Sequence, residues 1–444
     1  MELPFQVSEI LERIERAGFA GYVVGGCVRD HLMGMEPHDF DITSSAEPRE
    51  IENIFADCRV IETGIKHGTV TVLYKGISTE ITTFRVDGDY SDGRHPDSVS
   101  FSRNIEDDLA RRDFTINGIA YNPKLGFVDP FGGKEDIERG IIRCIGDPNR
   151  RFDEDALRVV RALRFSATLG FPIAEETAAA MLSHKAHLKK VSVERVFTEL
   201  KRLLCGKDVK RVLMEFSDIF AAIIPQLGAE IGYDQGSKYH NSTLYEHTAR
   251  AVEAAPDTVE MRLAMLLHDI GKPECRTVDE NGECHYYGHA EISARMTDEI
   301  LRMLKCDNAL REHVCEIVRY HDIPADTSRR YIRRQLAKHG AEVFADIMAA
   351  HIADDSAKCD FCRDRIPKIR EVLAIAEEIS AEKPCLSVKT LEISGNDLKD
   401  IVPPSPLMGE ILSKLLEEVV DEKLANEKPA LLKRAAELMS ELNQ

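Results

Sequence analysis

The chain has 444 residues, with 58 lysines and arginines against 77 aspartates and glutamates, which gives a formal net charge of −19. This length exceeds what one hydrophobic core can serve and predicts roughly two to four domains. The acidic balance excludes a protein coated uniformly with basic charge, although a local basic track would suffice to bind RNA. The 11 cysteines are irregularly spaced and no apolar run reaches membrane-spanning length. We therefore expect free thiols, a cytoplasmic protein and no membrane partner.

The first informative element is a short buried strand at 21–24, followed by Gly25, Gly26 and a helix start. A strand that ends in two glycines before a helix leaves backbone N–H groups free to hold phosphate oxygens. Asp39 and Asp41 follow, and on an extended segment both carboxylates project from one face. Paired carboxylates can hold divalent cations against a triphosphate. The combination predicts nucleotidyl transfer, although Gly-Gly and Asp-x-Asp also occur in ordinary surface loops.

A β-hairpin comes next, with strands at 68–74 and 77–86 around a Lys75-Gly76 turn. Its second strand carries Glu80, which we predict to be the third carboxylate of a two-metal site. A solvated strand position would explain Glu80 equally well. Further along, Arg112 offers a planar fork that can hold two triphosphate oxygens at once, or it forms a structural ion pair with a neighbouring aspartate.

From about Phe152 onward the pattern becomes helical almost everywhere. On a helix over 154–164, Asp155 lies beside Arg158 at i, i+3. A carboxylate accepts and a guanidinium donates, so the pair matches the edges of cytosine and adenine and rejects guanine and uracil. A salt-bridged helix face would show the same spacing. A basic track at 185–211 is either an RNA contact or a solvated helix surface.

A second group of potential metal ligands lies between residues 245 and 354. It combines adjacent His-Asp with further imidazoles and a carboxylate, which together suit a transition metal. This constellation resembles the HD phosphohydrolase superfamily. The resemblance implies the metal ligands His247, His268, Asp269 and Asp354, with His289 and His321 available for a second metal. Satisfied core histidines in a scaffold domain are the alternative.

Six motifs occur in one order along the chain: GGCVRD, DFDIT, TEITTFR, GRHPDSVSF, RRDFTIN and EDALRVVRALRF. In this order they closely resemble the bacterial class II tRNA nucleotidyltransferases, the CCA-adding enzymes. The resemblance implies template-independent addition of C, C and A to the 3′ end of tRNA from CTP and ATP, with Mg²⁺ as cofactor. It implies that Asp39 and Asp41 bind magnesium and that Glu80 completes the catalytic trio.

The resemblance also implies roles for the remaining motif residues. The implied nucleotide-binding residues are Gly25, Gly26, Arg29, Arg112, Asp155, Arg158, Arg161 and Arg164. Residues 92–96 correspond to the flexible loop that helps to switch selection from C to A.

We expect an α+β fold in which a head with a mixed or antiparallel sheet precedes an all-helical remainder. The expected parts are a polymerase-β-like nucleotidyltransferase head at 1–145, a helical neck at 146–215, an HD body at 216–365 and a tail contacting tRNA at 366–444. The alternatives are a poly(A) polymerase, a partial CC- or A-adding enzyme, and an HD phosphohydrolase with a nucleotide-sensing head.

Overall fold

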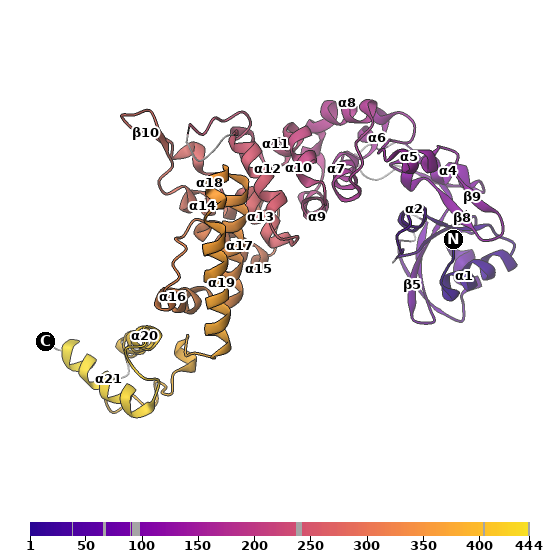
Figure 1. Cartoon of the computed structure of the whole chain (residues 1–444). Coiled ribbons are helices and arrows are strands. Elements are labelled where there is room, and N and C mark those ends of the chain that lie inside the picture. The colour runs from indigo at the N-terminus through magenta and orange to yellow at the C-terminus, as the bar shows by residue number, and fades with distance from the viewer. Residues whose placement is uncertain are drawn as a thin grey trace. The chain divides into compact units, whose positions relative to one another are not determined.

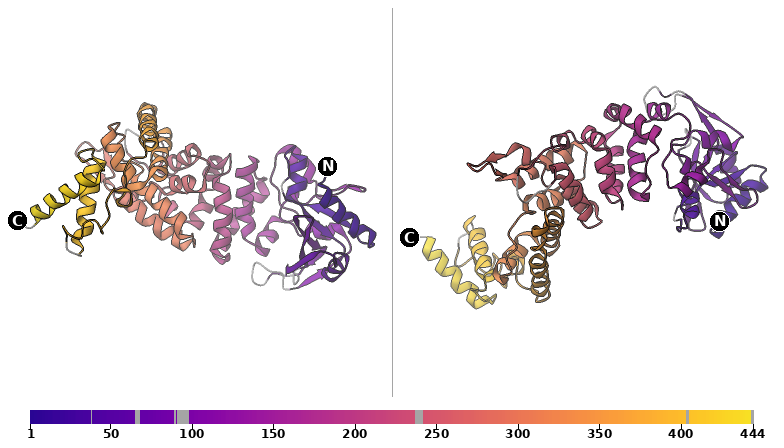
Figure 2. Two further views of the ribbon diagram at one scale, coloured as in Figure 1. Left: turned by 90° about the horizontal axis from the view of Figure 1, so that it is seen from below. Right: turned by 45° about the horizontal axis from the view of Figure 1, so that its top comes forward.

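The computed structural model describes residues 1–37, 39–64, 68–88, 90, 98–236, 242–402 and 405–442. The chain divides into two compact units, residues 1–228 and 229–444. Strands gather in the first unit, and helices make up nearly all of the second (Figures 1 and 2). This arrangement confirms the predicted α+β class. Among the described helices, none combines the length and the apolar character that crossing a bilayer requires.

A seven-stranded sheet forms the centre of the first unit, in the order β3-β4-β5-β2-β1-β8-β9. Among the described strand pairs of this sheet, only β2–β5 is parallel. The strands of this sheet are β1 (Gly21–Val24), β2 (Asp41–Ser44), β3 (Arg59–Gly64), β4 (Thr69–Tyr74), β5 (Ile77–Thr83), β8 (Ala120–Asn122) and β9 (Gly126–Val128). The register pairs Val24 with Asp41 and Ile42 with Ile81, so the end of β1, the start of β2 and the middle of β5 meet.

Two turns of the first unit depend on glycine residues that adopt positive φ angles. Gly25, between β1 and the helix α2 (Gly26–Leu32), has φ +75°. A Cβ at Gly25 would also lie 3.4 Å from a guanidinium nitrogen of Arg112. In the predicted hairpin, Lys75 (φ 45°) and Gly76 (φ 87°) make a two-residue turn between Tyr74 and Ile77, as tight hairpins require.

The hairpin is confirmed, but its second strand is shorter than expected. It ends at Thr83; the buried Phe84 donates its N–H to the carbonyl of Ser44 in β2, and its own carbonyl accepts from the N–H of Ser102. Residues 85–87 then form β6 (Arg85–Asp87), which pairs with β7 (Val99–Phe101) in a separate two-stranded sheet.

Helix α1 (Phe5–Arg16) packs its apolar stripe against the sheet. Its buried residues Val7, Ile10, Leu11 and Ile14 follow the helical period and join the core beneath the strands. The other helices of the first unit are α3 (Pro48–Ile54), α4 (Ile105–Ala110), α5 (Gly133–Arg139), α6 (Pro148–Glu154), α7 (Leu157–Leu169), α8 (Glu175–His184), α9 (Val193–Leu204), α10 (Val209–Glu215) and α11 (Ser217–Ile223). Short 3₁₀ segments lie at Thr115–Asn117 and Lys185–Lys190.

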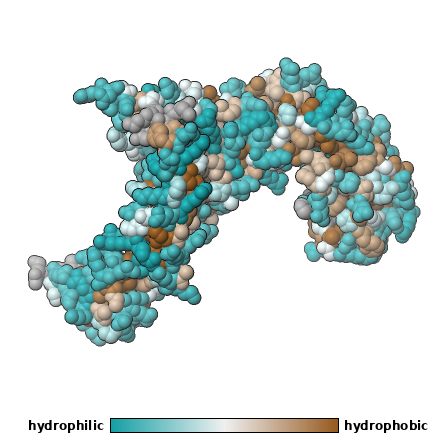
Figure 3. Space-filling model, in the orientation of Figure 1, coloured by the Kyte–Doolittle hydropathy of each residue, from teal (hydrophilic) through white to brown (hydrophobic). Residues whose placement is uncertain are grey.

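The second unit is helical, with one small exception: a hairpin of β10 (Thr277–Val278) and β11 (Cys284–His285). Its helices are α12 (Leu244–Ala254), α13 (Val259–Leu267), α14 (His289–Met303), α15 (Asn308–Tyr320), α16 (Arg329–His339), α17 (Ala341–Ala357), α18 (Asp360–Arg363), α19 (Ile366–Ala381), α20 (Leu407–Val420) and α21 (Lys428–Leu442). Helices α16, α17 and α19 share one apolar cluster, and residues 385–438 form another. On the face drawn in Figure 3, hydrophilic side chains cover most of these helices.

Candidate functional site

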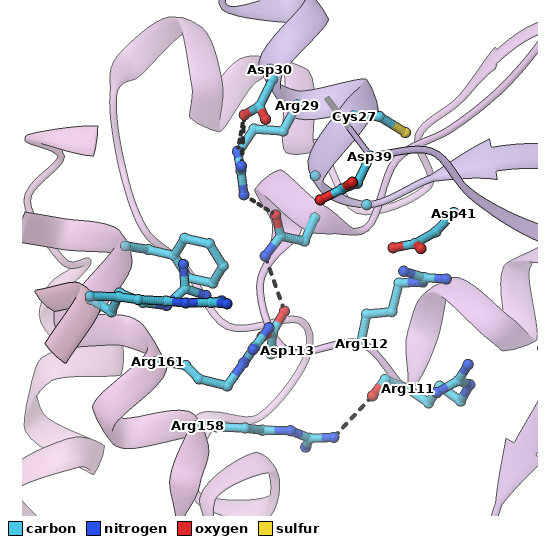
Figure 4. Close-up of a pocket in the computed structure, with 16 residues that line it drawn as sticks. Cys27, Arg29, Asp30, Asp39, Asp41, Arg111, Arg112, Asp113, Arg158 and Arg161 are labelled. Atoms are coloured by element: carbon cyan, nitrogen blue, oxygen red, sulfur yellow. Dashed lines mark hydrogen bonds and ion pairs between the residues drawn. The ribbon is translucent and has the colours of Figure 1, made fainter. Parts of the chain in front are cut away.

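A polar cavity of about 610 Å³ lies in the first unit (Figure 4). The residues that line it come from the β1–α2 turn, the start of β2, the 111–117 segment and helices α7 and α9. They are Gly25, Gly26, Cys27, Arg29, Asp30, Asp39, Asp41, Arg111, Arg112, Asp113, Asn117, Arg158, Arg161, Arg164, Phe165 and Arg202. The cavity therefore brings together most of the predicted nucleotide-binding residues.

Three carboxylates converge at one end of the cavity. Asp39 and Asp41 face it from the entry to β2, beside Arg112 (Figure 4). Glu80 shares an adjoining cavity of about 240 Å³ with Asp41 and Arg112. Burial raises the pKa of the Asp41 carboxyl, and the negative charges of Glu80 and Asp39 add to the rise, while Arg112 opposes it. Clustered carboxylates of this kind fit a hard divalent cation, which would offset their mutual repulsion.

Arginines surround the rest of the cavity, and neighbouring groups hold their side chains in place. Arg29 donates to Asn117 Oδ1 at 2.8 Å and pairs with Asp30 at 2.6 Å. Arg112 pairs with the buried Asp108 at 3.1 Å. Such positioned guanidiniums, next to the β1–α2 turn, suit a polyphosphate.

A buried ion-pair network fixes the arginines of α7. Asp113 Oδ2 accepts from Arg161 at 2.7 and 2.8 Å, and its Oδ1 accepts from the backbone N–H of Phe114 at 2.8 Å. Glu199 of α9 pairs with Arg164 at 2.5 Å and with Arg161 at 3.5 Å. Burial acts to raise the pKa of Asp113, but the charge and hydrogen bonds of Arg161 lower it to about 2.

Replacing Asp113 with asparagine should therefore reduce the free energy of unfolding at pH 7 by roughly 2 kcal/mol. Because the folded pKa lies below the unfolded value of 3.8, this stabilisation is present above about pH 4 and is lost as the pH falls through 2. Urea unfolding measured from pH 7 to pH 3 gives the free energy of unfolding of both proteins. The difference between the wild type and Asp113→Asn should become smaller as the pH falls.

The matched control is Asp57→Asn, which breaks an ion pair with Arg13 whose aspartate side chain is 60% exposed. Solvent screens this pair, so its loss should cost less. If Asp113→Asn and Asp57→Asn lost the same free energy of unfolding at pH 7, the buried Asp113 pair would not be the stronger of the two.

The expected helix over 154–164 is wrong in one respect, because α6 ends at Glu154 and α7 begins at Leu157. Asp155 is extended between them (φ −152°) and accepts from the backbone N–H of Leu157 at 3.0 Å. Its carboxylate pairs with Arg195 of α9 at 2.6 Å. Arg158 pairs with Glu154 instead, at 2.6 Å, and donates to the Arg111 carbonyl at 3.1 Å.

In this structure the two side chains of the predicted base-reading pair have different ion-pair partners. Arg158 lines the cavity, whereas Asp155 is not among the described residues that do. Seven further residues line it that were not predicted as site residues: Cys27, Asp30, Arg111, Asp113, Asn117, Phe165 and Arg202. The first six lie in the GGCVRD, RRDFTIN and EDALRVVRALRF motifs, and Arg202 lies in the basic track, so only the fold shows that Arg202 faces the same cavity as the motif residues. Residues 92–96, predicted as a selection loop, lie outside the described residues.

The second unit contains a buried cluster of possible metal ligands. One ligand atom from each of His247, His268, Asp269 and Asp354 lies within 4.8 Å of the others, and all four residues are buried. His247 Nε2 is 3.1 Å from Asp354 Oδ1 and 3.3 Å from Asp269 Oδ2. These side chains come from α12, the end of α13 and α17. The structure thus brings the predicted first set together.

The predicted second set lies on the other oxygen of Asp269. Its Oδ1 is 3.3 Å from His289 Nε2 and 3.9 Å from His321 Nε2, so this carboxylate faces both groups. Burial acts to lower the pKa of His268, but the charges of Asp269 and Asp354 raise it. Lys272 pairs with Asp269 and Lys358 with Asp354, which further offsets their negative charge. Imidazole and carboxylate converging in this way fit one or two transition-metal ions.

Comparison with known proteins gives three family matches. Residues 21–143 match the poly A polymerase head domain, residues 170–230 the probable RNA and SrmB-binding site of polymerase A, and residues 287–435 the putative domain 2 of tRNA nucleotidyltransferases. The CCA-adding enzyme of Ligilactobacillus salivarius is 34% identical over 443 residues, which cover 97% of this chain and 96% of that one. The CCA-adding enzyme of Limosilactobacillus fermentum is 36% identical over 431 residues, with the same coverage of both chains.

Solved structures agree with this result. The crystal structure of the Bacillus stearothermophilus CCA-adding enzyme in complex with CTP matches with a TM-score of 0.74 and 31% identity, covering 100% of both chains. The Thermotoga maritima CCA-adding enzyme complexed with tRNA has a TM-score of 0.58 and 19% identity, covering 98% of this chain and 96% of that one, a likeness of fold.

Proposed function

Because this chain belongs to the CCA-adding enzymes, we propose that it adds C, C and A to the 3′ end of tRNA from CTP and ATP and releases pyrophosphate. The observation that carries the proposal is the convergence of Asp39 and Asp41 on a cavity lined by arginines and the β1–α2 turn. Binding of a nucleoside triphosphate needs two features: a site for the divalent cation that accompanies its phosphates, and hydrogen-bond donors for the phosphate oxygens.

In this proposal Asp39, Asp41 and Glu80 hold Mg²⁺. The bound cation would neutralise charge on the phosphoryl oxygens and favour deprotonation of the attacking tRNA hydroxyl. Arg29 and Arg112 bind triphosphate oxygens, and the N–H groups of the Gly25-Gly26 turn contribute further donors. Because Asn117 and Asp108 hold the two arginines, little rearrangement is needed when the nucleotide binds.

We propose that Arg158 and Asp155 read the base edge, supported by Arg161 and Arg164. Asp155 already pairs with Arg195, and its two oxygens keep further lone pairs that can accept an exocyclic amine of the base. The acceptor and donor order would then admit cytosine and adenine and reject uracil and guanine.

Arg158→Ala should lower the preference for CTP over UTP by about 5- to 150-fold, the equivalent of roughly 1–3 kcal/mol for a bidentate contact. The ratio of the two kcat/KM values measures this preference. Arg150→Ala is the matched control, because Arg150 pairs with the same Glu154 but is 70% exposed. A fall in rate with an unchanged ratio would show that Arg158 positions the nucleotide without reading its base.

The experiment that tests the function is incorporation on tRNA transcripts lacking one, two or three terminal nucleotides, with each nucleoside triphosphate singly and mixed. The proposal predicts C, C, A and then arrest, without use of GTP or UTP. Long A tracts would favour the poly(A) polymerase alternative, and arrest after CC would favour the partial enzyme. Absence of incorporation would favour the phosphohydrolase with a nucleotide-sensing head.

We propose a second activity for the HD-like cluster at His247, His268, Asp269 and Asp354, namely hydrolysis of a phosphomonoester or a 2′,3′-cyclic phosphate. The observation that favours it is the burial of four ligand groups around one point, which core histidines without a function do not require. We also propose the functional division into head (1–145), neck (146–215), HD body (216–365) and tRNA-contacting tail (366–444).

A further inference from the structure

A third group of potential ligands lies in the first unit, outside the nucleotide cavity. It consists of Asp153 in the last turn of α6, His184 at the end of α8 and His187 in the following 3₁₀ segment. One ligand atom of each lies within 4.8 Å of the others. Helices α6 and α8 pack directly on each other (Figure 1).

The two imidazoles converge on a single oxygen. Asp153 Oδ1 is 3.3 Å from His184 Nε2 and 3.6 Å from His187 Nδ1. In a tetrahedral site with bonds of about 2.0–2.2 Å, neighbouring ligand atoms lie about 3.3–3.6 Å apart. Both nitrogen–oxygen distances therefore match those between ligands of one ion, and the two nitrogens lie within 4.8 Å of each other.

Hydrogen bonding determines which nitrogen of His184 faces the carboxylate. His184 Nδ1 lies 2.8 Å from the carbonyl of Ala180, so Nδ1 carries the proton in a neutral ring. Its Nε2 lone pair then points at a carboxylate oxygen, and two acceptors face each other. A metal ion between the ring nitrogen and the carboxylate oxygen would satisfy both. A metal-ligating histidine commonly donates its other N–H to a backbone carbonyl, as His184 does here.

The two imidazole rings lie close enough to share one ion, since their centroids are 5.2 Å apart. One divalent ion satisfies both nitrogens and the carboxylate together. The His184 side chain is only 12% exposed, whereas that of Asp153 is 62% exposed, so solvent can supply the remaining ligand.

We propose that Asp153, His184 and His187 form a site for a divalent transition metal such as Zn²⁺, which fastens α6 to α8 and the segment after it. Two nitrogens and one carboxylate suit zinc better than magnesium or calcium. The ion fixes the last turn of α6, whose Glu154 holds Arg158 at the nucleotide cavity. The proposal stands independently of the nucleotidyl-transfer activity.

The test compares zinc binding by the full wild-type chain and by His187→Ala. Chelator-stripped protein is dialysed against buffered Zn²⁺, and the bound metal is measured by elemental analysis. The wild type should retain one more ion per chain than His187→Ala at the same free Zn²⁺. Loss of one ligand should weaken binding at this site by at least the roughly 10- to 100-fold seen on loss of an outer-shell partner. The HD-like cluster is intact in both proteins, so any zinc bound there contributes equally to both measurements and does not affect their difference.

Two variants make the comparison specific. Lys189→Ala, an exposed neighbour in the same segment, should bind zinc like the wild type. His187→Asp keeps a ligand atom and should recover part of the affinity. Equal zinc content and affinity in the wild type and His187→Ala would overturn the proposal and leave an ordinary ion pair. Far-UV circular dichroism checks that His187→Ala remains folded.

Discussion

Asp41→Asn is expected to reduce incorporation of CTP and ATP into tRNA by roughly 10³-fold or more, since a catalytic divalent cation supplies several kcal/mol of charge stabilisation. Asparagine keeps the shape of the side chain but removes one negative charge and weakens cation binding. Asp41 lines the cavity at the first position of β2, outside the apolar core, so the fold should tolerate the change. Single-turnover incorporation, at a Mg²⁺ concentration that saturates the wild type, measures the chemical step directly.

The control for Asp41→Asn is Glu62→Gln. Glu62 is an exposed carboxylate on β3, the edge strand of the same sheet, and losing its charge should leave incorporation unchanged. Raising the Mg²⁺ concentration should partly restore Asp41→Asn if the lost function is cation binding. Incorporation by Asp41→Asn within tenfold of the wild type would exclude Asp41 as a metal ligand.

The local parts of the first unit could be predicted from sequence because their causes are local. The strand before Gly25 is a run of apolar residues, and a glycine pair allows the sharp entry into α2. The Lys75-Gly76 turn needs positive φ, which glycine supplies. These features depend on neighbours within a few residues, so composition and spacing suffice.

The side-chain partners in the candidate site could not be predicted from the sequence, because they are ion pairs between residues far apart in the chain. Helical spacing placed Asp155 beside Arg158, but Asp155 pairs with Arg195, 40 residues away, and breaks the helix at its own position. Asp113 holds Arg161 across 48 residues in the same way. Partners at such distances depend on how helices pack, and no periodicity in the sequence encodes it.

The histidine clusters likewise could not be found from the spacing of residues in the sequence. His247, His268 and Asp354 are widely separated, and a resemblance to a known constellation, not their spacing, brought them into one prediction. No such resemblance existed for Asp153, His184 and His187, and His187 was assigned to a basic track instead. Only the packing of α6 on α8 reveals that this histidine faces a carboxylate.

His268→Ala in the second unit is expected to abolish bound transition metal at the HD-like cluster and to lower hydrolysis of a 2′,3′-cyclic phosphate by roughly 10³-fold or more. His268 is fully buried and its Nε2 lies 3.2 Å from both His247 Nε2 and Asp269 Oδ2. Its removal therefore takes a ligand from the centre of the cluster. Elemental analysis and hydrolysis of 2′,3′-cyclic nucleotide measure the two effects on the same preparation.

The control for His268→Ala separates loss of the metal from loss of the fold. His313 pairs with Asp346 at 2.8 Å in the same unit, outside the cluster, so His313→Ala removes a His–Asp pair without removing a ligand. It should keep the metal and the hydrolysis. Both variants should still incorporate CTP, because the proposed catalytic residues Asp39, Asp41 and Glu80 lie in the other unit. Wild-type protein without bound metal, together with unchanged hydrolysis in His268→Ala, would identify the cluster as a set of core histidines. Loss of hydrolysis in His268→Ala, with CTP incorporation kept, would instead mean that the second unit carries a metal-dependent reaction of its own, separate from the chemistry of the first unit.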